Sequence, residues 1–212
     1  ISESLGSDTG SIQLLAGTNF FQDGSGDIST GNAGVIIVEA DNNGNGAGVI
    51  TMSDGATTRS TGGDILYRTP GDIVIGGIAS NSGQIRLESE NGSLLDGGDS
   101  DADLSGSDVL LLAANGSIGL PGDFLEGQVD NLSGTASLSG FYFNNTGDLN
   151  LLPLEGIEPA SGGEMVLNIV GNLDLSALTV SGNLDATATG NITDTDALLV
   201  GGASYFEAGG DV

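Results

Sequence analysis

The sequence predicts an all-β fold, a parallel β-helix (β-solenoid) of roughly ten coils, each about 19–24 residues long. The C-terminal segment indicates this most directly, because residues 171–189 are followed by a second copy of the same pattern at residues 190–208. The glycines that open the two copies, Gly171 and Gly190, are 19 residues apart. A repeat of about 20 residues is one supersecondary unit that must stack on its neighbours to bury an apolar face.

Each half of a coil begins with glycine and a small polar residue and continues with apolar residues that alternate with polar ones. In the first C-terminal copy, the alternating apolar residues are Leu173, Leu175, Leu184 and Ala186. Alternation with a period of two indicates a strand with one buried face. Glycine and asparagine suit the corners because both tolerate positive φ. One repeat is too short for a strand-helix-strand crossover, so two or three short strands joined by turns are expected.

The same motif continues through the rest of the chain. It is irregular in the first third and clear in the middle, where its glycines are Gly63, Gly71, Gly83, Gly92, Gly106 and Gly116. Residues 153–163 hold two of the four prolines and are expected to form a loop excursion. Since no segment shows helical spacing, we expect essentially no α-helix and one domain over residues 1–212, as a piece of a longer chain.

The composition restricts the possible partners. Three arginines and no lysine stand against 29 acidic residues, which gives a net charge of −26. Such a surface repels phosphate backbones and anionic lipids and attracts cations, so neither nucleic acid nor a membrane surface is an expected partner. The sequence has no run of about 18 apolar residues, so membrane insertion by a helix is not expected. Salt outside a cell screens this self-repulsion, and the protein is therefore expected to be secreted.

Two acidic segments are candidate calcium sites, and no other cofactor is expected. In residues 41–46, Asp41, Asn43 and Asn45 match the first half of a calcium loop whose closing carboxylate is replaced by Met52. The alternative there is a plain Asn/Gly turn. In residues 96–108, Asp99, Asp101 and Asp103 alternate and can direct three carboxylates at one point. The alternative for this segment is a solvated acidic loop.

Two alternative classes of function stay open: a carbohydrate-binding or glycoside-cleaving β-helix, and a calcium-stabilised repeat module. A polysaccharide lyase needs a basic residue, and the chain offers three arginines with neither lysine nor histidine. A glycosidase needs two carboxylates and aromatic platforms; the one aromatic cluster is Phe141, Tyr142 and Phe143. Strand alternation places Phe141 and Phe143 on one face, where core packing is the simpler explanation. We therefore assign no catalytic residue and expect a protein that is not an enzyme.

The ladder of GDI, GNL, GSI and GNI motifs, the 19-residue tandem, the phrase LLLAANGSIG at residues 110–119 and the lack of cysteine resemble the filamentous haemagglutinin class of large bacterial exoproteins and adhesins. The resemblance implies a right-handed parallel β-helix within a long shaft on the cell surface, used for attachment, aggregation or biofilm formation. Its implied partners are glycans or proteins on host or neighbouring cells, bound by regions outside this segment. Open coil ends also allow homotypic assembly end to end.

Overall fold

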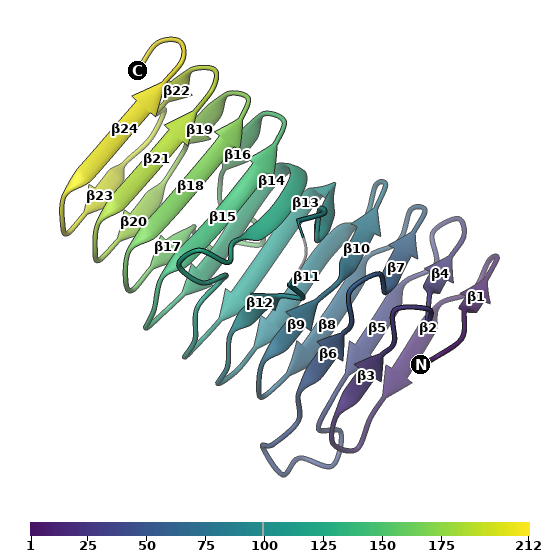
Figure 1. The fold of residues 1–212 in the computed structure, drawn as a ribbon. Helices are drawn as coiled ribbons and strands as arrows, with labels where there is room; N and C mark the ends of the chain where they lie inside the picture. The colour runs from purple at the N-terminus through teal and green to yellow at the C-terminus, as the bar shows by residue number, and fades with distance from the viewer. Residues whose placement is uncertain (99) are drawn as a thin grey trace.

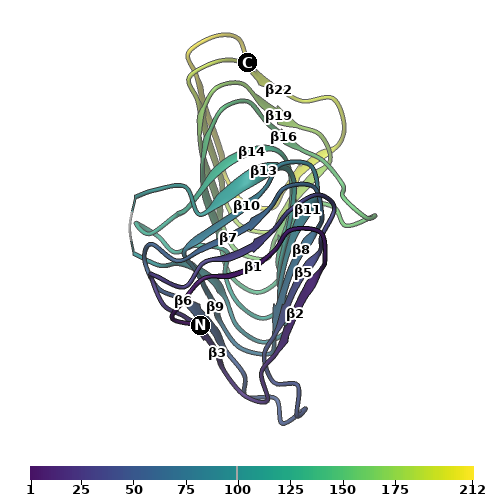
Figure 2. The same ribbon diagram turned by 90° about the vertical axis from the view of Figure 1, so that its right-hand side faces the viewer.

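The protein is a β-solenoid, described here in a computed structural model that covers residues 1–98 and 100–212. The described residues form 24 strands and no helix, and the coils stack in a single row of about nine turns from the N-terminus to the C-terminus (Figure 1). Figure 2 shows the coils one behind another. Every pairing between named strands is parallel. The predicted all-β parallel solenoid is therefore confirmed.

Each coil contributes strands to three stacks, which we call faces A, B and C. Face A begins with short strands and ends with long ones: β1 (Leu5–Ser7), β4 (Ile28–Thr30), β7 (Thr57–Ser60), β10 (Gly77–Ser80), the first halves of β13 (Leu104–Ala113) and β14 (Leu125–Ala136), then β15 (Phe141–Thr146), β18 (Met165–Val170), β21 (Leu184–Ala188) and β24 (Ser204–Ala208). The strands β13 and β14 pass from face A into face B without a break.

Face B begins as one stack and ends as two stacks of short strands. It starts as one stack of β2 (Ile12–Leu15), β5 (Ile36–Glu39), β8 (Ile65–Thr69), β11 (Gln84–Ser89) and the second halves of β13 and β14. After β14 it divides into two stacks of short strands: β16 (Leu149–Leu151), β19 (Leu173–Leu175) and β22 (Ile192–Thr193) in one, and β17 (Ala160–Ser161), β20 (Leu178–Val180) and β23 (Leu198–Val200) in the other.

Face C is a four-stranded sheet of β3 (Phe20–Gln22), β6 (Ile50–Met52), β9 (Ile73–Ile75) and β12 (Leu94–Asp96). It continues as single bridges from Leu94 to Ile118 and from Ile118 to Phe141. Phe141 is the first residue of β15, whose later residues pair with face A. Faces A and C therefore merge into one long strand per coil from β15 onward.

Inward-facing residues stack in columns because the coils are in register. One column on face B consists of Ile12, Ile36, Ile65, Ile85 and Val109. All five belong to one buried apolar cluster that also includes the C-terminal Leu173, Leu184 and Ile192. Since each coil buries its apolar face only against the coils above and below, stability depends on the columns being filled layer by layer.

The glycine-polar motif has a structural reason at the corners. A Cβ at Gly83 would collide with the carbonyl oxygen of Gly63, one coil earlier, so only glycine allows the coils to approach there. The following polar residue, Asp64, accepts a hydrogen bond of 2.9 Å from the backbone N–H of Gln84 on the next coil. Asp148 accepts the same bond from Asn172 at 2.8 Å, and the two donors of Asn172 lower the pKa of that carboxyl group.

A buried asparagine completes the hydrogen bonding where the faces rearrange. The strand β14 pairs with β15 as far as Gly127 and with β16 from Asn131 onward, so Val129 between them has no strand partner on that side. The side chain of Asn145, 2% exposed, accepts from the Val129 N–H at 3.0 Å and donates to the Val129 carbonyl at 3.1 Å. The amide thus substitutes for a strand backbone.

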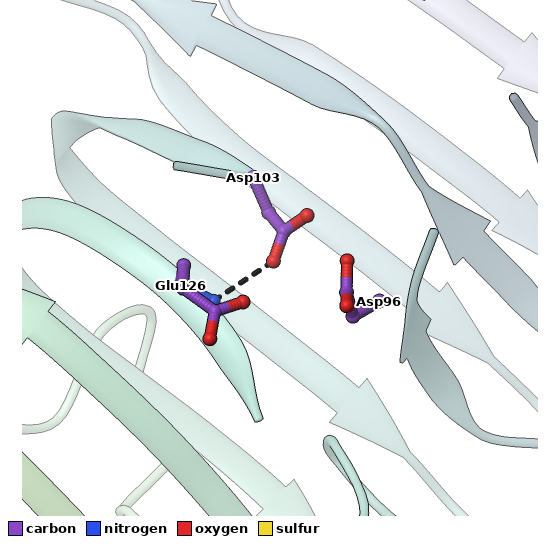
Figure 3. Close-up of side chains that lie close together, drawn as sticks. All are labelled: Asp96, Asp103 and Glu126. Atoms are coloured by element: carbon purple, nitrogen blue, oxygen red, sulfur yellow. Dashed lines mark hydrogen bonds between the residues drawn. The ribbon is translucent and has the colours of Figure 1, made fainter. Parts of the chain in front are cut away.

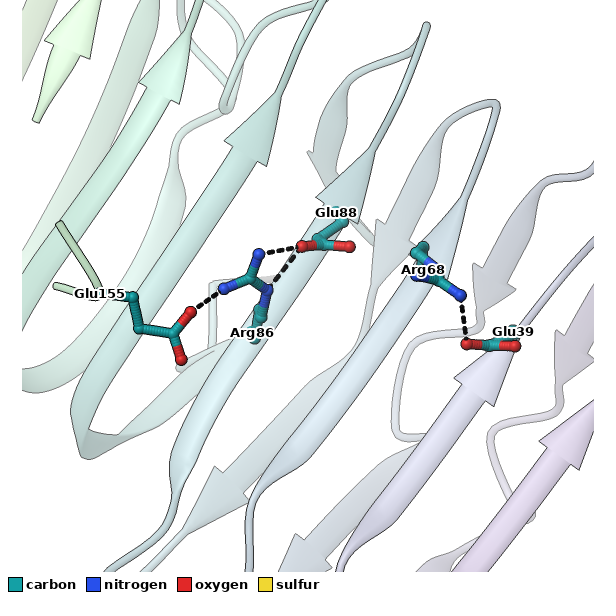
Figure 4. Close-up of polar contacts among 5 residues, drawn as sticks. All are labelled: Glu39, Arg68, Arg86, Glu88 and Glu155. Atoms are coloured by element: carbon teal, nitrogen blue, oxygen red, sulfur yellow. Dashed lines mark hydrogen bonds and ion pairs between the residues drawn. The ribbon is translucent and has the colours of Figure 1, made fainter. Parts of the chain in front are cut away.

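The excursion after β16 is a small hairpin that lies over face B. It occupies residues 152–159, shorter than the expected 153–163 range at its far end, because Ala160 and Ser161 form β17. Leu154 and Ile157 form an antiparallel bridge, and Glu155 at its tip forms an ion pair with Arg86 of β11 (Figure 4). The Ile157 carbonyl also accepts a hydrogen bond from the buried hydroxyl of Ser133.

We predict that Asn145→Ala destabilises the protein by about 2–4 kcal/mol, because it leaves the Val129 N–H and carbonyl buried without partners. Asn168→Ala removes an exposed amide one coil away and is expected to change stability by less than about 0.5 kcal/mol. Urea unfolding followed by circular dichroism measures both. Equal effects of the two substitutions would contradict the role assigned to Asn145.

We also predict that deletion of residues 171–189 leaves a folded solenoid. The deleted segment is one whole coil, and Gly190 can take the place of Gly171 because the two glycines are equivalent positions of consecutive coils. The rod should shorten by ~4.8 Å, which small-angle X-ray scattering can measure. Deletion of residues 171–180 removes half a coil, breaks the register and should abolish cooperative unfolding.

Candidate functional site

Three carboxylates from two consecutive coils meet at the corner between faces C and A. Asp96 ends β12, Asp103 immediately precedes β13, and Glu126 lies at the start of β14. One carboxylate oxygen from each lies within 4.8 Å of the others (Figure 3). Asp103 is 1% exposed and Asp96 is 8% exposed.

The register of the coils brings these residues together. Leu104 pairs with Gly127, so the preceding residues, Asp103 and Glu126, occupy the same position on consecutive coils. Asp103 accepts a hydrogen bond of 2.8 Å from the backbone N–H of Glu126. Asp96 is the last residue of β12 and pairs with Ile75, the last residue of β9 on the preceding coil. A carboxylate therefore occupies a position that holds an apolar side chain one coil earlier.

The cluster concentrates negative charge in a poorly solvated position. Burial raises the pKa of Glu126, and the charge of Asp96 raises it further, whereas a hydrogen bond from the Asn144 amide lowers it. That bond is 3.0 Å long and reaches Oε1, while Oε2 is buried without a hydrogen-bond partner among the described residues. Either a proton on Glu126 or a cation relieves this repulsion.

The arrangement does not fit glycoside cleavage. Inverting glycosidases hold their carboxyl groups ~6.5–9.5 Å apart and retaining ones ~5–5.5 Å apart, on either side of a bound sugar. Here Asp96 and Asp103 are buried, so the cluster does not present two accessible carboxyl groups to the two sides of a sugar.

The calcium candidate of residues 96–108 is only partly reproduced by this cluster. Asp99 lies outside the described residues. Asp101 is exposed and is not among the three clustered carboxylates, whereas Asp103 is. Sequence reasoning missed Asp96 and Glu126. One coil length separates Asp103 from Glu126, which is the signal that pairs them.

The other calcium candidate forms a compact turn. Asp41 has a φ of 64° and accepts hydrogen bonds from the N–H groups of Asn45 at 2.9 Å and Gly46 at 2.7 Å. The side-chain oxygen of Asn43 also accepts from Asn45, and that of Asn45 accepts from Ala47. The three predicted donors therefore stabilise their own loop, and calcium binding by this loop stays a prediction.

Two hollows lie along the outside of face A, next to the corner formed by residues 100–102. The N-terminal hollow has a volume of about 440 Å³ and is lined by Arg59, Asp101 and Gln128 among others. The C-terminal hollow, of about 610 Å³, is lined by Asp101, Glu126, Gln128 and residues of β15, β18 and β21. Among the described lining residues of both hollows there is no aromatic side chain.

The three residues of the aromatic cluster are all buried, two of them in the core and one on the outside of the sheet. Phe141 and Phe143 are 1% and 0% exposed and point into the core, as the strand alternation predicted. Tyr142 points outward but is covered, with its ring 5.8 Å from that of Phe124 in an edge-on contact. Burial and the acceptor Glu164 raise the pKa of Tyr142 to about 12. None of the three is an exposed sugar platform.

The comparisons with known proteins concern the C-terminal coils. Residues 162–212 match a family model described as repeats of unknown function (DUF5649). No curated protein and no solved structure matches the chain. Within the described part of the chain, no helix is long and apolar enough to span a bilayer. The chain is thus a β-solenoid with repeats.

We predict that the wild-type protein gains stability as the pH falls from about 7.5 to about 5, because the folded state raises the pKa of Glu126 and so binds its proton more tightly than the unfolded state. At the higher pH, Glu126→Gln should melt at or above the melting temperature of the wild type. Its melting temperature should rise less than that of the wild type when the pH is lowered. Calorimetry measures the melting temperature of both proteins at each pH.

Repeating the melts with EDTA tests the calcium prediction, since removing a bound cation lowers the midpoint of thermal unfolding.

The control for Glu126→Gln is Asp130→Asn, which removes one exposed carboxylate from the same strand. It changes the net charge by the same amount and should leave the pH dependence close to that of the wild type. The assignment of the pH dependence to the buried cluster would be contradicted if the melting temperature of Glu126→Gln depended on pH as strongly as that of the wild type. It would also be contradicted if both variants showed a reduced pH dependence.

Proposed function

We propose that this chain is a rigid spacer in a secreted, acidic bacterial adhesin or extracellular filament. It holds a binding region elsewhere in the protein away from the cell, in attachment, aggregation or biofilm formation. The partner is a glycan or protein on a host or neighbouring cell, and open coil ends allow assembly with further copies. In this proposal the chain acts through its shape and stiffness and performs no catalysis.

The supporting observation is the unbroken register. Parallel pairings link every coil to the next, from Leu5 on β1 to Ala208 on β24, and the apolar columns are continuous across them. About nine turns of ~4.8 Å give a rod roughly 40 Å long. Bending such a rod requires breaking backbone hydrogen bonds along one side, so it keeps its direction.

The surface and the sequence motifs support the same proposal. The 29 acidic residues keep a long rod soluble and discourage lateral association. Two of the three arginines are held on face B by glutamates, Arg68 by Glu39 at 2.7 Å and Arg86 by Glu88 and Glu155 (Figure 4). The glycine-polar motifs that resemble filamentous haemagglutinin exoproteins are the corners of this solenoid.

The test replaces residues 1–212, within the full-length protein displayed on cells, by an unrelated β-solenoid with the same number of coils. A spacer function predicts that attachment to the target cells is retained. A solenoid with half as many coils should reduce attachment in proportion to the lost reach. Loss of attachment with the equal-length replacement, despite normal surface display, would show that this chain holds the binding site itself.

A further inference from the structure

The outward side of face A has two parallel files of side chains between β14 and β21. The first, which we call the amide file, has one residue on each of four consecutive coils: Glu126, Asn144, Asn168 and Thr187. The second, which we call the threonine file, lies two residues further along the chain in each coil: Gln128, Thr146, Val170 and Thr189. Both files line the C-terminal hollow of about 610 Å³.

The amide file is held in a fixed orientation by its own hydrogen bonds. Asn168 donates from Nδ2 to Oδ1 of Asn144 at 3.0 Å, and Asn144 donates from Nδ2 to Oε1 of Glu126 at 3.0 Å. Each amide therefore keeps one N–H that no described protein group accepts. These donors repeat at the coil spacing of ~4.8 Å, and they need no rearrangement to meet a ligand.

The threonine file adds an apolar side chain. Val170 is 60% exposed, and Thr146 and Thr189, on the coils before and after it, are also exposed. The two files are separated by two residues of an extended strand, about 6.6 Å. The hollow therefore presents one hydrogen-bonding side chain per coil along one side, and on the other side the aliphatic Val170 between two threonines.

The charges of the hollow determine which polymers fit. Its lining includes Glu126 and Asp101 and none of the three arginines. Carboxylates repel uronates, sulfated glycans and nucleic acids. They accept hydrogen bonds from hydroxyl groups. The backbone groups of face A are already paired between coils, so an extended peptide cannot add to this face as a strand.

We propose that this side of face A binds a linear, uncharged polysaccharide that lies along the solenoid axis with one sugar ring per coil. A sugar ring has hydroxyl groups at its edge, which can accept from the amide file, and C–H groups on its face, which can pack on the exposed Val170. An extended chain of β-linked hexoses advances by nearly one coil spacing per ring. This binding is independent of the spacer function, which needs no ligand on the side of the rod.

The test titrates the chain with β-1,4-linked glucose oligomers of increasing length, measured by isothermal titration calorimetry. The affinity should rise with length until the oligomer spans the four coils of the amide file, and then level off. Asn168→Ala removes a donor from the middle of the file and should weaken binding about five- to tenfold. Val170→Glu should abolish binding, because it places a charge on the apolar side.

The matched control is Asn150→Ala. Asn150 is an exposed amide on face B that donates to Asn131 at 3.1 Å, so the two substitutions remove the same chemistry from different faces. It should leave the affinity unchanged. The proposal is overturned if no neutral oligomer binds, if Asn168→Ala and Val170→Glu bind like the wild type, or if oligogalacturonate binds more tightly than the neutral oligomer of the same length.

Discussion

The constraint on which the structure depends is that backbone hydrogen bonds run along the axis from one coil to the next. Every residue in a paired strand therefore lies over its equivalent in the preceding coil. Side chains at the same position of successive coils form a column, and each must pack favourably against its neighbours in that column. Inward columns are aliphatic, as in Ile12, Ile36 and Ile65 on face B. Corner columns need glycine for close approach and a short polar side chain to accept the N–H of the following coil.

The solenoid changes its cross-section without losing this register. Faces A and C merge and face B divides around β14 and β15, which leaves Val129 without a strand neighbour on one side until Asn145 supplies one. The Phe143 ring occupies the space that a side chain at Gly127 would fill, and at Gly134 the Leu111 carbonyl oxygen and the Phe141 ring leave no space for one. The Asn145 side chain replaces a missing strand backbone, and phenylalanine rings pack against glycines in the core. Together these two features allow the faces to rearrange within one coil.

The repeated local motif predicts the fold because each coil repeats the same requirement. Gly171 and Gly190, one coil apart, are sufficient to give the period and the corner. The carboxylate cluster was not predictable in the same way, because it depends on which residue lies over which across a corner of irregular length. Alternation in the sequence suggested that Asp101 and Asp103 act together. In the structure Asp103 instead faces Glu126 of the next coil and Asp96 at the end of β12, while Asp101 is exposed.

In-register stacking also limits where a chain with a net charge of −26 can place its carboxylates. Two carboxylates in one column would lie ~4.8 Å apart and repel by about 1 kcal/mol or more. On face B, Asn131 and Asn150 separate Asp108 from Asp174, and Asn131 donates to Asp108 at 2.8 Å. The amide file separates acidic residues on face A in the same way. The cluster of Asp96, Asp103 and Glu126 departs from this spacing; there burial raises the pKa of Glu126, and the charge of Asp96 raises it further. Amides placed between acidic residues therefore both limit repulsion and leave fixed hydrogen-bond donors along the side of the rod.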